Sequence, residues 1–127
     1  MIYVVESRKS LGELSRALEE SVVRNKFGIL GVHNLKEAME KKGVEFGKEC
    51  IIYEVCNPNQ AKKVLEANLE ISTALPCRIS LYVEGDRTKL ATIKPTAMLA
   101  LFPNRELMDV AREVEETIVR IMEEAAG

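Results

Sequence analysis

A chain of 127 residues suits one domain with one hydrophobic core, and no Gly-, Ser- or Pro-rich linker divides it, so we expect a single domain over residues 1–127. Its 18 basic and 20 acidic residues leave a net charge of −2, which disfavours a nucleic-acid partner. No apolar run reaches the roughly 20 residues of a membrane span, and Glu6 interrupts the position of a signal peptide. With three cysteines, an odd number, these features predict a cytoplasmic protein with no membrane partner.

The first half of the chain alternates strands and helices. Ser10 and Glu13 form a capping-box pattern, and apolar residues at helical spacing predict a helix from there to about Asn25. Asn34 is an N-cap candidate for a short helix that Gly43 ends. The predicted strands of this half are Ile2–Glu6, Lys26–His33 and Glu49–Cys56.

The second half begins with a helix that has Asn57 as N-cap, Pro58 at its first position and an end near Asn68. Residues 77–85 then alternate, with Ile79 and Leu81 on one face and Arg78 and Ser80 on the other. Such alternation is typical of an antiparallel sheet with one wetter face. The remaining predicted elements are a turn at Glu84–Thr88, a return strand at Lys89–Lys94, a segment at Pro95–Pro103 that is either a short helix or an extended cover, and a long amphipathic helix at Asn104–Glu124.

This order predicts an α+β fold with a mostly antiparallel sheet, helices chiefly on one face and a long C-terminal helix. The alternative is a ferredoxin-like split βαβ fold with an added C-terminal helix.

Four short patterns occur in order along the chain. They are Phe27-Gly28-Ile29-Leu30, Cys56-Asn57-Pro58, Leu75-Pro76-Cys77 and Ile93-Lys94-Pro95. In these patterns the chain resembles the family known as domain of unknown function 302. The resemblance implies a small α+β domain with a sheet like that of the TATA-binding protein, and it implies a homodimer. It supplies no activity. It also gives no role for His33, because His33-Asn34-Leu35 stands where the family usually has an acidic residue, just after the second strand.

Cys56 ends a strand and directly precedes the N-cap Asn57, where a helix N-terminus favours a thiolate. Cys77 opens the next long strand, and His33 ends the second one. If these strand ends meet at one edge, the three side chains suit zinc or copper(I), or a thiol activated by a base. Arg78 could grip an anionic ligand, so the candidate ligand-binding residues are Cys56, Asn57, Cys77, His33 and Arg78, with Cys56, Cys77 and His33 as candidate metal ligands.

A structural explanation competes with this one, because free cysteines often serve as small apolar fillers and the Cys and His spacings match no zinc signature. Three functions therefore stay open. The first is a dimeric binding protein with a pocket near Cys56, for a small-molecule or anionic ligand. The second is a thiol- or metal-dependent enzyme using Cys56 with His33 or Cys77, and the third is a purely structural or interaction dimer. No motif indicates a particular cofactor or reaction.

Overall fold

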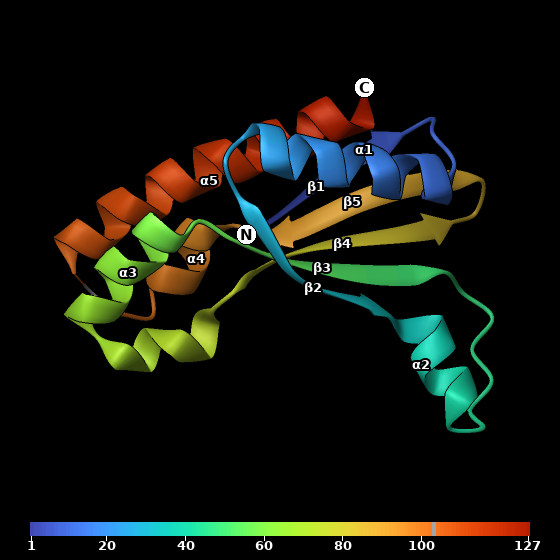
Figure 1. Cartoon of the computed structure of the whole chain (residues 1–127), viewed down its shortest axis with the longest axis horizontal. Coiled ribbons are helices and arrows are strands. Elements are labelled where there is room, and N and C mark those ends of the chain that lie inside the picture. The colour runs from blue at the N-terminus through green and yellow to red at the C-terminus, as the bar shows by residue number, and fades with distance from the viewer. Residues whose placement is uncertain (103) are drawn as a thin grey trace.

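A computed structural model of the chain describes residues 1–102 and 104–127 (Figure 1). Pro103, which ends the predicted segment Pro95–Pro103, lies outside the described residues. The strands are β1 (Ile2–Ser7), β2 (Gly28–Asn34), β3 (Cys50–Cys56), β4 (Cys77–Glu84) and β5 (Arg87–Ile93). The helices are α1 (Leu11–Arg24), α2 (Leu35–Lys41), α3 (Pro58–Ala67), α4 (Pro95–Leu99) and α5 (Arg105–Ala126), with a 3₁₀ helix, η1, at Leu69–Ala74.

The five strands form one sheet in the order β1-β5-β4-β3-β2, and every neighbouring pair is antiparallel. This confirms the predicted α+β class with its antiparallel sheet. The split βαβ alternative is wrong because such a unit places a single strand between the two strands it connects, whereas β5, β4 and β3 all lie between β1 and β2. The predicted β4–β5 hairpin is present and turns at Gly85, whose positive φ of 64° suits a residue without a Cβ. Glu84 pairs with Arg87, so β5 begins before the predicted start at Lys89.

Helices α1 and α5 lie side by side on one face of the sheet (Figure 1). The capping box predicted at Ser10 and Glu13 starts α1, and the side chain of Asn104 caps α5. Both helices direct an apolar stripe at the sheet, and each large side chain buried there contributes roughly 1.5–3 kcal/mol before entropy is counted. The central core consists of Leu14, Leu18 and Val22 from α1, Ile118, Ile121 and Met122 from α5, and Tyr53, Val55, Ile79, Leu81 and Leu90 from the sheet.

A second apolar cluster lies beyond one end of the sheet and forms a small lobe. It joins Val64 of α3, Ile71 of η1 and Leu99 of α4 to Leu107 and Ala111, near the start of α5. Helix α5 is about 33 Å long at 1.5 Å per residue, so its second half packs on the sheet while its first half holds this lobe.

The face of the sheet opposite α1 and α5 carries mixed side chains. The strand registers place Val4, Ala91, Ser80, Ile52 and His33 side by side across the five strands. Helix α2 follows the edge strand β2 and projects from the sheet as an arm (Figure 1). None of its residues is buried. Among the described residues, every helix is too short or too polar to pass through a bilayer.

Candidate functional site

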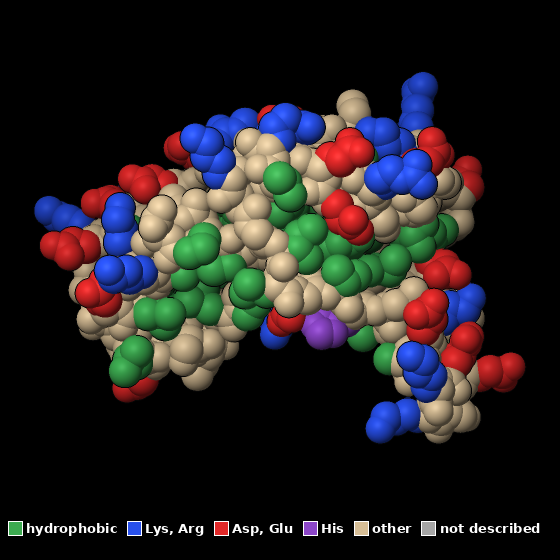
Figure 2. All heavy atoms as spheres, viewed as in Figure 1, with side chains coloured by type: hydrophobic (Ala, Val, Ile, Leu, Met, Phe, Trp, Pro, Cys, Tyr) green, Lys and Arg blue, Asp and Glu red, His purple; other side chains and the backbone are tan. Residues whose placement is uncertain are grey.

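A cavity of about 110 Å³ lies where the lobe meets the ends of β3 and β4. Its wall comes from α3, the turn before β4, α4 and α5, and is mostly apolar. Figure 2 shows hydrophobic side chains gathered on the surface over α3, α4 and η1. The residues that shape the cavity include Val55, Ala61, Val64, Leu99, Val110 and Val114.

Cys56 and Cys77 both line this cavity. The antiparallel pairing of β3 and β4 explains why, because the last residues of β3 lie beside the first residues of β4 and Val55 pairs directly with Cys77. Cys77 packs on the central core, so its side chain shares the helix-covered face with Val55. Cys56 follows Val55 and points to the other face of the strand, so the two thiols reach the cavity from different sides.

Burial raises the pKa of the Cys56 thiol, and burial together with the neighbouring Cys56 raises the pKa of Cys77 to about 11. The sequence predicts that the helix N-terminus favours the Cys56 thiolate, whereas burial disfavours the charged form and the pKa is raised instead. The N–H of Gln60, one of the first in α3, is already paired with the side chain of Asn57. Neither cysteine therefore has the lowered pKa that a nucleophilic thiol requires.

The structure does not bring His33 to the two cysteines. His33 pairs with Ile52, four residues before Cys56 on β3, which at about 3.3 Å per residue separates them by roughly 13 Å along the strand. The C-terminal ends of β2 and β3 do not meet as predicted, because the two strands are antiparallel and these ends point in opposite directions. Within residues 1–102 and 104–127, no group of three or more His, Cys, Asp or Glu side chains could hold a metal ion.

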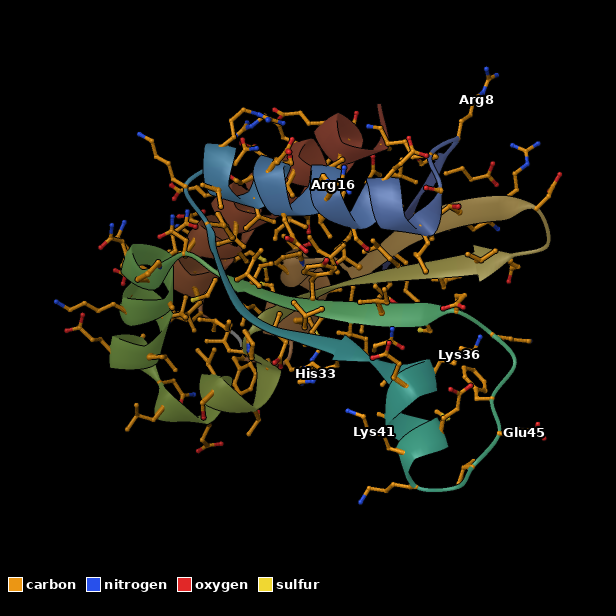
Figure 3. All side chains as sticks on the ribbon, turned by 45° about the vertical axis from the view of Figure 1, so that its right-hand side comes forward. Arg8, Arg16, His33, Lys36, Lys41 and Glu45 are labelled. Atoms are coloured by element: carbon orange, nitrogen blue, oxygen red, sulfur yellow. The ribbon has the colours of Figure 1, made fainter. Side chains whose placement is uncertain are left out.

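His33 instead contacts Glu54, with its Nε2 atom 2.8 Å from the Oε1 atom of the carboxylate. Glu54 Oε2 also lies 3.7 Å from Nε of Arg78. The hydrogen bond from His33 lowers the pKa of Glu54, and the charges of His33 and Arg78 lower it further. Figure 3 shows His33 beside β2, between the lobe and the α2 arm that carries Lys36 and Lys41.

Asn57 and Arg78 border the cavity, but their polar groups have structural partners. The Asn57 side-chain oxygen accepts the Gln60 N–H at 3.1 Å, and its Nδ2 donates to the Lys26 carbonyl at 3.5 Å. The Arg78 side chain is largely exposed beside Glu54. Of the five predicted site residues, four therefore lie at one cavity, and His33 lies elsewhere.

Gln60, in the first turn of α3, also lines the cavity, and the sequence analysis does not name it as a site residue. Its Oε1 atom is buried and has no hydrogen-bond partner among the described residues. No local signal marks it, because the cavity that gives it a role is closed by α4 and α5, far along the chain.

Comparison with known proteins places the chain in a family. The family model "Domain of unknown function DUF302" matches residues 3–125. The crystal structure of uncharacterized conserved protein DUF302 from Bacillus stearothermophilus superimposes with a TM-score of 0.93 at 31% sequence identity, covering 98% of this chain and 97% of that one. A search of curated proteins finds no match. The family match and the structural match agree, and the chain belongs to the DUF302 family.

Proposed function

We propose that this protein is a cytoplasmic, homodimeric binding domain that takes a small, mainly apolar molecule into the cavity beside Cys56. The observation that carries the proposal is the cavity itself, an apolar space that opens where two hydrophobic clusters meet. A well-packed domain has few voids larger than a water molecule, so a space of this size calls for an occupant. Three free cysteines among the described residues support a reducing compartment such as the cytoplasm.

The size of the cavity limits the ligand. A dry apolar cavity of about 150 Å³ binds benzene, and the cavity here measures about 110 Å³. A single ring or a short hydrocarbon chain fits if part of it stays at the mouth. Cys56 and Cys77 contribute polarizable apolar surface to such a site, which is consistent with their raised pKa values.

The experiment is a titration with toluene, followed by the backbone amide signals of the protein in NMR. We expect signals of cavity residues such as Ala61 and Val110 to shift, while those of Ala38 on the projecting α2 arm stay in place. The variant Ala61→Leu fills the cavity and should abolish the shifts. Ala38→Leu adds the same atoms on the exposed arm and should leave the titration unchanged.

Shifts that spread over the whole chain, or that survive Ala61→Leu, would show that toluene binds elsewhere and would overturn the proposed binding site. The absence of any shift up to the solubility limit of toluene would overturn the proposed function as a whole.

The homodimer is supported by the open face of the sheet. Val4, on the edge strand β1, is 46% exposed, and its neighbours Ile2 and Ile93 are 62% and 47% exposed. These three side chains form a contiguous apolar patch, because Ile2 pairs with Ile93 and Val4 lies two residues along β1. Strand β1 is also an edge strand, so among the described residues one row of its backbone groups has no neighbouring strand to pair with. A second copy of the chain would cover both the apolar patch and the unpaired backbone groups of β1.

Sedimentation at micromolar concentration tests the homodimer. We expect a dimer for the unmodified chain and a monomer for Val4→Lys, since a charge at that patch opposes burial. Val44→Lys places the same charge on another exposed valine, in the loop after α2, and should remain a dimer. A monomer mass for the unmodified chain contradicts the homodimer without affecting the cavity.

A further inference from the structure

The cavity contains one polar atom that nothing in the described protein satisfies. Gln60 lies in the first turn of α3, where the side chain of Asn57 holds its backbone N–H at 3.1 Å. Its side chain reaches the cavity wall, and its Oε1 atom is buried without a hydrogen-bond partner. Among the described residues the other such atom is Ser15 Oγ, which does not line this cavity.

A buried acceptor without a donor is costly, and native proteins keep few of them. Around Gln60 the cavity is mostly apolar. The last torsion of a glutamine side chain has a broad energy profile, so the carboxamide turns toward the cavity at little cost. A molecule that enters with a hydrogen-bond donor would therefore give Gln60 Oε1 a partner that none of the described residues supplies.

We propose that the ligand is a neutral molecule with an apolar body and one hydroxyl group, an alcohol or a phenol, and that this hydroxyl donates to Gln60 Oε1. The inference rests on the proposed function, because it specifies what the same cavity binds.

The charges around the cavity separate a neutral donor from a charged one. No Asp or Glu is among the described residues that line the cavity, so an ammonium group would lose its hydration without gaining a counter-charge. Arg78, at the rim, adds to this by repelling a cation. An anion fits no better, because Arg78 already contacts Glu54 and the Gln60 acceptor would face the negative charge. A hydroxyl supplies the donor without carrying a charge.

Phenol and toluene are the matched probes, because they have nearly the same size and differ by a hydroxyl in place of a methyl group. Their dissociation constants would be measured by NMR titration of the unmodified protein and of Gln60→Met, which keeps the side-chain length but removes the acceptor. We expect the preference for phenol relative to toluene to fall about five- to tenfold in Gln60→Met, as the loss of one net hydrogen bond predicts. Lys63→Met, on the exposed side of the same helix, should leave this preference unchanged.

The unliganded protein gives an independent readout. Gln60→Met removes an unsatisfied buried acceptor, so its melting temperature should equal or exceed that of the unmodified chain. A clear drop in melting temperature would show that Oε1 has a partner in the empty protein and would overturn the inference. If toluene and phenol both bind and Gln60→Met leaves their ratio unchanged, the hydroxyl inference fails while the binding function stands. If neither molecule binds, the proposed function itself fails.

Discussion

His33 Nε2 lies 2.8 Å from Glu54 Oε1, and this contact crosses the bare space above Gly31. A Cβ atom on Gly31 would lie 2.8 Å from the same carboxylate oxygen and 3.4 Å from the same histidine nitrogen. The register of β2 against β3 shifts between Ile29 and Gly31, which marks a β-bulge beside the contact. The absence of a side chain at Gly31 therefore leaves room for the contact between His33 and Glu54.

Gly31→Ala is predicted to separate His33 from Glu54. The added methyl group would lie only 2.8 Å from the carboxylate oxygen, which is too close for a carbon atom, so the Glu54 side chain must shift. Because the hydrogen bond from His33 is the largest cause that lowers the pKa of Glu54, this pKa should rise toward its ordinary value. NMR titration of the Glu54 carboxyl group measures the change. Gly47→Ala, where an added Cβ meets nothing within 4 Å, is the control and should leave Glu54 unaffected.

Tyr53→Phe should remove a stabilising hydrogen bond and so lower the free energy of unfolding at neutral pH. It should also make this free energy fall less at alkaline pH than it does in the unmodified protein. The Tyr53 hydroxyl donates to Glu19 Oε2 at 2.6 Å, and burial together with Glu19 raises its pKa to about 12. The neutral phenol is thus favoured in the folded state, so its contribution is complete below the unfolded pKa of about 10 and is lost as the pH rises through about 12. We expect Tyr53→Phe to cost about 1.5 kcal/mol at neutral pH.

Urea unfolding at about pH 8 and about pH 11 checks this expectation. The difference in free energy of unfolding between the unmodified protein and Tyr53→Phe should be smaller at the higher pH. A gap that stays constant would mean that Tyr53 does not ionise more readily on unfolding.

Cys77 should be the slower of the two cavity thiols to react with iodoacetamide. With a pKa of about 11, about one thiol in a thousand is ionised at about pH 8, and only the thiolate attacks. Mass spectrometry of peptides after timed alkylation gives the rate at each cysteine. Unfolding in urea should raise the Cys77 rate by at least tenfold, and equal rates at Cys56 and Cys77 in the folded protein would contradict the prediction.

Asn57→Ala should destabilise the whole domain by about 1 kcal/mol, because it removes the side-chain cap of α3. Asn57→Asp keeps an acceptor for the Gln60 N–H and should be close to neutral. Asn34→Ala is a matched control, since Asn34 caps α2 through Glu37 in the same way, but α2 buries no residue. Chemical denaturation should therefore show a loss for Asn57→Ala and almost none for Asn34→Ala.

Local rules predicted most of the fold. The capping pattern at Ser10, the Asn57-Pro58 start and the Gly85 turn each depend on a few adjacent residues, and each is found where the sequence predicts it. The sequence analysis does not predict η1, because Leu69–Ala74 is too short to show helical periodicity. The segment after Pro95 could be helix or cover from its sequence, and packing on α5 settles it as the short helix α4.

The candidate site was less accessible to sequence reasoning. Strand neighbours decide which residues meet, and a single sequence does not reveal that β3 lies between β2 and β4 with both pairs antiparallel. That arrangement brings Cys77 to the end of β3 and leaves His33 at the other end. Gln60 gains its importance from the cavity that α4 and α5 close around it, and this depends on contacts between distant parts of the chain.

The position of β1 in the sheet has a consequence for how the protein folds. Strands β2, β3 and β4 each pair with the strand that follows them in the chain, whereas Val4 of β1 pairs with Ala91 of β5, across most of the chain. Closing so long a loop is entropically costly and slows folding. Strand β1 must therefore wait until β5 has been made, and until then the backbone groups of β1 have no strand partner and can pair with other chains.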